Sequence, residues 1–303
     1  MPVSPWREAL SGFDILAISL AVGVAAALLW LLPDAQTPDE WRSDSRRRLR
    51  LLLILTLTLL TLTSIATLIA RSAAISGASL LDVGSVVPLV LTRTDFGRVW
   101  FARGIAVVLL WLVWLALKPA NRQPRLYWLL LCLVAVVAFT RSATGHPGDH
   151  GDFAMPVWFD WLHLLAAGLW GGVVIAFIVA VRPRLLSAHA LVTARFSSVA
   201  AVGLGLVAAT GIYNAWHSLD GWGSLWTTRY GAILDIKVGL VILMALLGAS
   251  NRFLYVPRVV RQDQSALRAL RTLVALAACE ALLMLAVVAV VALLINAMPP
   301  ADM

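Results

Sequence analysis

Eight apolar stretches, each about as long as a lipid bilayer is thick, divide this 303-residue chain. A helix that crosses a bilayer needs roughly 20 predominantly apolar residues. The stretches cover residues 13–32, 49–70, 98–117, 126–145, 157–181, 196–217, 231–250 and 271–295. Each must be helical, because lipid offers the backbone no hydrogen-bonding partner. The expected fold is therefore an all-α, polytopic membrane protein with eight transmembrane helices.

The amino-acid composition excludes the common soluble classes. Residues of the set AVILMFWYC make up 61% of the chain and charged residues 13%, whereas a soluble domain is about half apolar and about a quarter charged. Cys132 and Cys279 each lie in an apolar stretch, without the paired spacing of a thiolate metal site. A soluble enzyme and a disulfide scaffold are therefore excluded.

Two regions need separate interpretation. The stretch 73–92 is fairly apolar, but its glycines together with Asp82 and Pro88 predict a surface-lying or re-entrant loop rather than a ninth span. The fourth stretch has a short apolar core, so its helix must continue past Arg141 toward His146 to cross the membrane comfortably.

The basic residues predict the orientation in the membrane. Sixteen of the 24 lysines and arginines fall in one set of loops, at 42–50, 118–125, 182–195 and 252–271. Loops that are rich in Lys and Arg stay in the cytoplasm. Both termini are therefore expected in the periplasm, and the net charge of +8 indicates topology rather than nucleic-acid binding.

Two pairs of short motifs indicate an internal repeat. Thr94-Asp95-Phe96-Gly97 followed by Arg103 has the same spacing as Thr228-Arg229-Tyr230-Gly231 followed by Lys237. Phe13-Asp14 likewise matches Phe159-Asp160. Because an even number of spans returns the chain to its starting side, the matches predict a 4+4 pseudo-repeat of two parallel halves.

Histidines gather on the side that we expect to face the periplasm. Four of the five lie there, at His146, His150, His163 and His217, whereas His189 is expected to be a solvated residue of a cytoplasmic loop. The loop 145–155 combines imidazoles, carboxylates and the thioether of Met155. Imidazole suits copper, zinc, nickel and iron, and a thioether favours Cu(I). A flexible polar loop whose histidines face water is the alternative.

His163 lies one turn inside the fifth span, on one helical face with Asp160 at i−3 and Trp170 at i+7. Ionisable groups within a span usually face a cavity, a partner or a pathway. His217 ends the sixth span, with Asn214 one turn below it. If these two spans are neighbours, His163 and His217 converge, and Asp160 is placed to orient the ring of His163. Helix-end histidines that reach the interface are the alternative.

Further charged residues lie within the later spans. Glu280 is near the middle of the eighth, and Asp235 and Lys237 lie within the first three turns of the seventh. They favour either a structural Glu280–Lys237 pair or a relay of polar steps toward the cytoplasm. The chain has no phosphate-binding loop, nucleophile elbow or zinc-protease motif, so no catalytic residue is predicted.

Several ordered motifs resemble the copper-resistance D (CopD) family of bacterial inner-membrane proteins. The matching segments are Gly145-His146, 159–172, Thr210-Gly211-Ile212-Tyr213-Asn214-Ala215-Trp216, 228–234 with Lys237, Asn251-Arg252 with Pro257, and Glu280. The likeness extends to 96–100 with Arg103 in the first half. We expect a single membrane domain over 1–303, with helices one to three in 1–125 and the CopD-like helices four to eight in 126–303.

The resemblance implies a multi-pass protein of the bacterial inner membrane that accepts copper in the periplasm and moves it across the membrane, with a periplasmic CopC-type carrier as partner. The candidate copper ligands are His146, His163, His217, His150 and Met155, and Asp160, Trp170, Asn214, Asp235, Lys237 and Glu280 are candidates for support or passage. The alternative is a haem-b oxidoreductase that uses two of these histidines as axial ligands, with copper or a quinone as redox partner.

Overall fold

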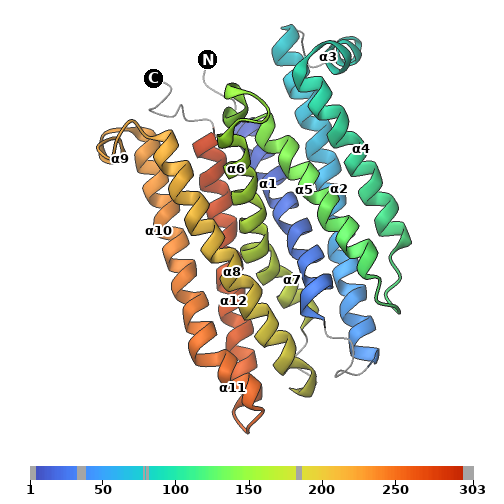
Figure 1. The fold of residues 1–303 in the computed structure, drawn as a ribbon, viewed down its shortest axis with the longest axis vertical. Coiled ribbons are helices and arrows are strands. Elements are labelled where there is room, and N and C mark those ends of the chain that lie inside the picture. Colours follow the sequence, from blue (N-terminus) through green and yellow to red (C-terminus); the bar gives the residue numbers. More distant parts are fainter. Residues whose placement is uncertain (1–4, 33–38, 78, 80–81, 182–185, 296–303) are drawn as a thin grey trace.

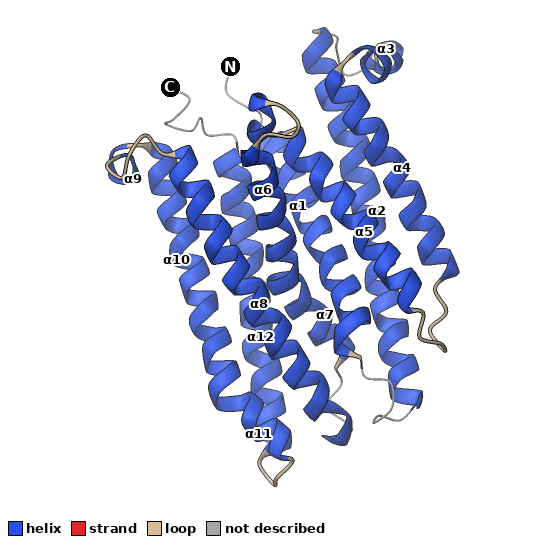
Figure 2. Cartoon of the chain, in the orientation of Figure 1, coloured by secondary structure: helices blue, strands red, loops and turns tan. Residues whose placement is uncertain are grey.

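The computed structural model describes residues 5–32, 39–77, 79, 82–181 and 186–295, and every regular element in these ranges is helical (Figure 2). The first half contains α1 (Pro5–Ala26), η1 (Ala27–Leu31), α2 (Asp39–Ser76), η2 (Val83–Ser85), α3 (Val87–Arg93), α4 (Asp95–Ala116) and α5 (Pro124–Ala143). The second half contains η3 (His146–His150), α6 (Met155–Ala167), η4 (Gly168–Gly172), α7 (Val173–Ala180), α8 (Leu186–Ser218), α9 (Ser224–Thr227), α10 (Arg229–Ser250), η5 (Asn251–Tyr255), α11 (Val256–Arg261) and α12 (Ala266–Ile295).

Eight of the described helical segments are long and apolar enough to cross a membrane, as the sequence predicts. Three are joined from shorter pieces: η1 continues α1, α6–η4–α7 forms the fifth span, and α10–η5–α11 forms the seventh. Large apolar side chains face outward, including Leu55 at 69% exposure and Leu282 at 67%. Such an apolar exterior suits lipid. The segment Val83–Arg93 forms only short helices and adds no ninth span.

Different elements lie at the two ends of the bundle (Figure 1). We call the end that carries α3, η3 and α9 the histidine end, and the end that carries α11 the arginine end. The start of α1 and the end of α12 both lie at the histidine end. At the arginine end, the arginine side chains bind the carbonyl groups of chain segments that end there: Arg46 donates to Pro119 O (2.6 Å) and Arg48 donates to Ala180 O (2.8 Å).

Helix α1 lies at the centre of the bundle, in contact with α2 and α5 and also with α6, η4, α7 and α12 of the second half. Its small residues Ala17, Ala21 and Ala25 are fully buried. The closest crossing joins Gly23 to Gly172 of η4, where a Cβ atom on Gly23 would lie 2.1 Å from the Gly172 carbonyl carbon. Small residues permit such close packing of membrane helices.

The prediction for His189 is wrong. This histidine is completely buried, and its ring packs edge-on against Trp41 at a centroid distance of 5.6 Å. Trp41 lies in the N-terminal part of α2, which extends beyond the apolar stretch, and its contact with the ring helps to remove His189 from water.

Candidate functional site

His163 inside the fifth span is held by the neighbouring helix α8. Its ring nitrogen Nδ1 lies 2.9 Å from Oγ1 of Thr210. The ring also packs over Gly211, where a Cβ atom would come within 3.3 Å of His163 Cε1. The absence of a side chain at Gly211 therefore makes room for the imidazole between α6 and α8.

The hydroxyl group of Thr210 determines which ring nitrogen carries the proton. It donates its single hydrogen to the carbonyl oxygen of Leu206, at 2.6 Å, in the usual i−4 pattern. Nδ1 of His163 must therefore donate to Thr210, and we assign the neutral Nδ1–H tautomer on this hydrogen-bond network. Nε2 then keeps a lone pair, which is the form of imidazole that coordinates metals.

Asp160 is bound to a neighbouring helix. Its Oδ2 accepts a hydrogen bond from Ser142 Oγ of α5 at 2.6 Å. The sequence predicted Asp160 as the acceptor for the ring of His163. The structure differs, because the ring turns toward Thr210 on α8 while the carboxylate faces Ser142 on α5.

The other candidate ligands lie nearer the histidine end. His146, Met155 and His217 are exposed, and the side chain of His150 lies outside the described residues. The ring of His217 stacks on Tyr213, which in turn stacks on Phe159. His217 follows Thr210 by seven residues, or about 10 Å along the helix. His163 and His217 therefore lie at different depths. Among the described residues, no three His, Cys, Asp or Glu side chains form a ready metal-binding group.

The remaining candidates divide between the interior and the surface. Trp170 is buried in η4, and Asn214 is half-buried on α8. Asp235 lies on the exposed face of α10, whereas Lys237 is half-buried. Glu280 is buried and accepts a hydrogen bond from Asn251 Nδ2 at 2.7 Å, so its partner differs from the Lys237 that the sequence suggested. Lys237 lies fourteen residues from Asn251, or about 21 Å along an ideal helix.

The first half holds a buried ion pair that sequence reasoning missed. Arg103 of α4 is completely buried and pairs with Asp14 of α1. Thr63 Oγ1 donates to Asp14 at 2.8 Å, and Arg103 Nε donates to Ser64 Oγ at 2.9 Å. Arg141 Nε of α5 lies 3.7 Å from the same carboxylate. The motif pairs Asp14/Asp160 and Arg103/Lys237 were the available signal, since their first-half members, Asp14 and Arg103, are the two residues of the ion pair.

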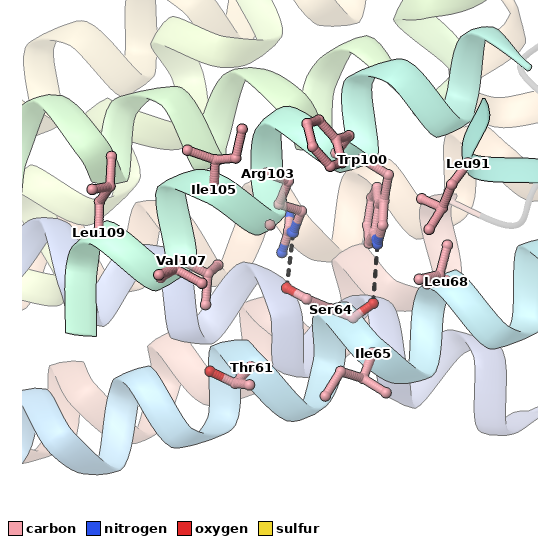
Figure 3. A pocket seen from close by; sticks show the side chains of 13 residues that line it. Thr61, Ser64, Ile65, Leu68, Leu91, Trp100, Arg103, Ile105, Val107 and Leu109 are labelled. Carbon is pink, nitrogen blue, oxygen red and sulfur yellow. Dashed lines mark hydrogen bonds between the residues drawn. The ribbon is translucent and has the colours of Figure 1, made fainter. Parts of the chain in front are cut away.

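An apolar groove of about 510 Å³ opens between α2 and α4 beside this cluster (Figure 3). Leu68, Leu91 and Ile105 are among its lining residues. Ser64 accepts hydrogen bonds at its floor, through Oγ from Arg103 and through its carbonyl oxygen from Trp100 Nε1 at 3.2 Å. The polar groups at this floor are thus already paired within the protein.

Comparison with known proteins gives consistent matches over most of the chain. Residues 190–294 match the family described as Copper resistance protein D, and residues 9–155 match the family described as Copper resistance protein D-like, N-terminal domain. No solved structure matches the chain.

Three relatives show the extent of the likeness. The Copper resistance protein D of Pseudomonas syringae pv. tomato is 29% identical over 212 residues, which is 65% of this chain and 66% of that protein. The Inner membrane protein YebZ of Escherichia coli is 27% identical over 207 residues, or 66% of this chain and 69% of YebZ. The Copper transport protein CutJ of Bacillus subtilis is 29% identical over 169 residues, which covers 52% of this chain and only 30% of CutJ.

The two family matches fall on both halves of the bundle, and the relatives include a copper-resistance protein and an inner-membrane protein. The eight bilayer-length helices agree with that membrane location. This chain is a multi-pass inner-membrane protein and belongs to the copper-resistance protein D (CopD) family.

Proposed function

We propose that this protein accepts copper at the periplasmic face of the inner membrane and moves it across, with His163 as the ligand inside the bundle. The observation that carries the proposal is the Thr210 contact, from which we assign the Nδ1–H tautomer of His163 with an unprotonated Nε2. Imidazole nitrogen is a good copper ligand. Two of the matched relatives are named for copper transport and copper resistance.

The exposed donors of the histidine end provide the first contact in this proposal. His146, Met155 and His217 are exposed around the end of the bundle where α6 begins and α8 ends. We place this end, and both termini, in the periplasm, because the Arg-rich loops lie at the opposite end. Copper then comes from a CopC-type carrier or directly from the periplasm, first to these donors with His150 and then to His163.

The polar residues near His163 support the proposed passage. Asp160 lies one turn before His163 on α6 and is held by Ser142. A half-buried carboxylate that is already oriented can lower the cost of a cation inside the bundle. Asp235 is exposed near the histidine end, so in this proposal it contacts copper only at the entrance of the passage. Glu280 supplies the deepest polar step.

We also propose that the bundle is a parallel 4+4 repeat. The two N-caps support this: Thr94 Oγ1 accepts from Gly97 N and Thr228 Oγ1 accepts from Gly231 N, both at 3.0 Å, and the backbone angles of the two threonines agree within 2°. The offset of 146 residues that relates Asp14 to Asp160 also relates Ser64 to Thr210. In this repeat, the Arg103–Asp14 ion pair of the first half lies at the position that the proposed copper site occupies in the second half.

The alternative, a haem-b oxidoreductase, requires two imidazoles on opposite faces of one porphyrin plane. The contacts of the histidines favour copper, since His163 is held by Thr210 and the ring of His217 stacks on Tyr213 about two turns farther out. An absorption spectrum of the purified protein separates the two functions, because bound haem gives a Soret band.

Copper content of the purified protein tests the proposal directly. Copper-loaded wild type is expected to retain copper and show no Soret band, and His163→Gln is expected to retain less copper per chain than wild type while inserting normally. His189→Gln is the matched control, since it removes an imidazole from the far end of the bundle. Equal copper content in all three proteins, or a Soret band in wild type, would contradict the assignment.

A further inference from the structure

The second half of the bundle holds two buried methionines whose role the proposed function leaves open. Met244 of α10 is 3% exposed and Met284 of α12 is 6% exposed, and both belong to the main core cluster. Met155, by contrast, is 62% exposed at the histidine end. The two buried thioethers are therefore positioned to act inside the membrane rather than at its surface.

The register between α10 and α12 places the two methionines opposite each other. Glu280 packs on Gly248, where a Cβ atom would lie 3.5 Å from Oε2, and this contact aligns the two antiparallel helices (Figure 1). Met244 lies four residues before Gly248 on α10, and Met284 lies four residues after Glu280 on α12. Each step is one turn, about 6 Å, toward the histidine end. The two methionines therefore lie at the same depth, on the faces of α10 and α12 that pack against each other.

Met284 also contacts the fifth span below His163. Its Sδ occupies the space beside Gly171, only 2.3 Å from where a Cβ atom on that glycine would lie. Gly171 follows His163 by eight residues, or about 12 Å along the helix axis. It belongs to η4, a π-helical turn, and π-helical turns are frequent at functional sites. The thioether of Met284 thus lies next to the span that carries His163, about two turns deeper.

One to two turns farther toward the arginine end, α12 and η5 bury two side chains with oxygen acceptors. Asn251 is 3% exposed, and its Nδ2 donates to Glu280 Oε1 at 2.7 Å. Its Oδ1 is buried and has no hydrogen-bond partner among the described residues. A buried amide oxygen without a hydrogen-bond partner is costly unless a cation or a donor reaches it. This polar pair places a carboxyl group and an amide oxygen one to two turns from the methionine level.

We propose that Met244 and Met284 form a second, inner site for Cu(I), with the carboxyl group of Glu280 and the amide oxygen of Asn251 one to two turns farther toward the arginine end. Thioether sulfur selects Cu(I) among the common metals of the cell. The site rests on the proposed function for its cargo and lies on the inward side of His163. Because copper passes between weak ligands of two kinds, imidazole at the entrance and thioether in the middle, neither site holds it permanently.

X-ray absorption of bound copper tests the inner site, because sulfur and nitrogen scatter differently. The background protein carries Cys132→Ala, Cys279→Ala and Met155→Leu, which remove the other sulfur atoms of the eight spans and of their described connections. Loaded with Cu(I), this protein is expected to show sulfur scattering. The double variant Met244→Leu/Met284→Leu is expected to lose the sulfur signal and one bound Cu(I) per chain. Leucine nearly conserves the volume of methionine, so folding is retained.

Two controls separate the inner site from the proposed function. Met298→Leu, a methionine that follows α12 in the sequence, is expected to keep the sulfur signal, and so is His163→Gln loaded with Cu(I). The inner site would be overturned if the background protein shows nitrogen and oxygen scattering without sulfur. It would also be overturned if sulfur scattering survives in the double variant. If the inner site is overturned in this way and His163→Gln abolishes copper binding, the proposed function stands without the inner site.

Discussion

A single hydroxyl group controls the chemistry that is open to His163. Thr210 receives the imidazole proton on Nδ1 only because its own hydrogen is bound to the carbonyl of Leu206. Partners of this kind fix the tautomer and the ring orientation of metal-binding histidines, and their loss typically lowers metal affinity 10–100-fold. The sequence alone indicated His163, because an ionisable residue within a span is unusual. It could not indicate that Thr210, although part of a CopD-like motif, is the partner of the ring, because the two residues are distant in sequence and meet only after α6 and α8 pack.

Thr210→Val tests this control at nearly constant side-chain volume. The variant cannot accept the Nδ1 proton, so we expect copper affinity at His163 to fall about 10-fold or more, while Thr210→Ser restores most of it. Competition with a chelator of known affinity measures the change. Unaltered affinity in Thr210→Val would show that the threonine is not needed to orient the ring.

At the scale of helices, close approach between spans fixes the site. The positions of the spans followed from the lengths of the apolar stretches, but the three π-helical turns η1, η4 and η5 did not. These turns depend on how a helix packs, as when Gly172 of η4 meets Gly23 of α1 without intervening side chains. The polar clusters could be predicted only in part, since Asp14, Asp160 and Asn251 were visible in motifs, whereas Ser142 and the pairing of Asn251 with Glu280 were not.

Gly23→Ala tests the importance of this crossing. Its new methyl group would lie 2.1 Å from the Gly172 backbone, so α1 must move away from η4. We expect a loss of about 1–3 kcal/mol of stability, the usual cost of overpacking, seen as a lower melting temperature in detergent. Gly239→Ala on α10 is the control, since nothing lies within 4 Å of its Cβ position. Equal melting temperatures for the two variants would contradict this account of the crossing.

At the scale of the whole molecule, the two ends of the bundle carry different chemical groups. Exposed imidazole and thioether groups lie at the histidine end, and the Arg-rich loops lie at the other. This separation was predictable from the order of spans and loops, because each crossing reverses the side of the membrane. The depth of His163 relative to His217 was not predictable, because it depends on the vertical offset of α6 against α8.

Reporter fusions test the orientation and the parallel repeat together. Fusions after Arg48, Lys118, Arg184 and Arg258 are expected to report the cytoplasm, and fusions near Asp82, Asp149 and Asp220 the periplasm. Thr94 and Thr228 must report the same side if the two halves are parallel. Cytoplasmic signal at Asp149, or opposite signals at Thr94 and Thr228, would rule out this topology.

Copper accumulation by proteoliposomes tests directly whether copper passes through the bundle by way of His163. Vesicles with wild-type protein and with His189→Gln are expected to take up copper faster than protein-free vesicles, whereas His163→Gln is expected to fall to the protein-free rate. Uptake by wild type that does not exceed that of protein-free vesicles, or full uptake by His163→Gln, would contradict the account.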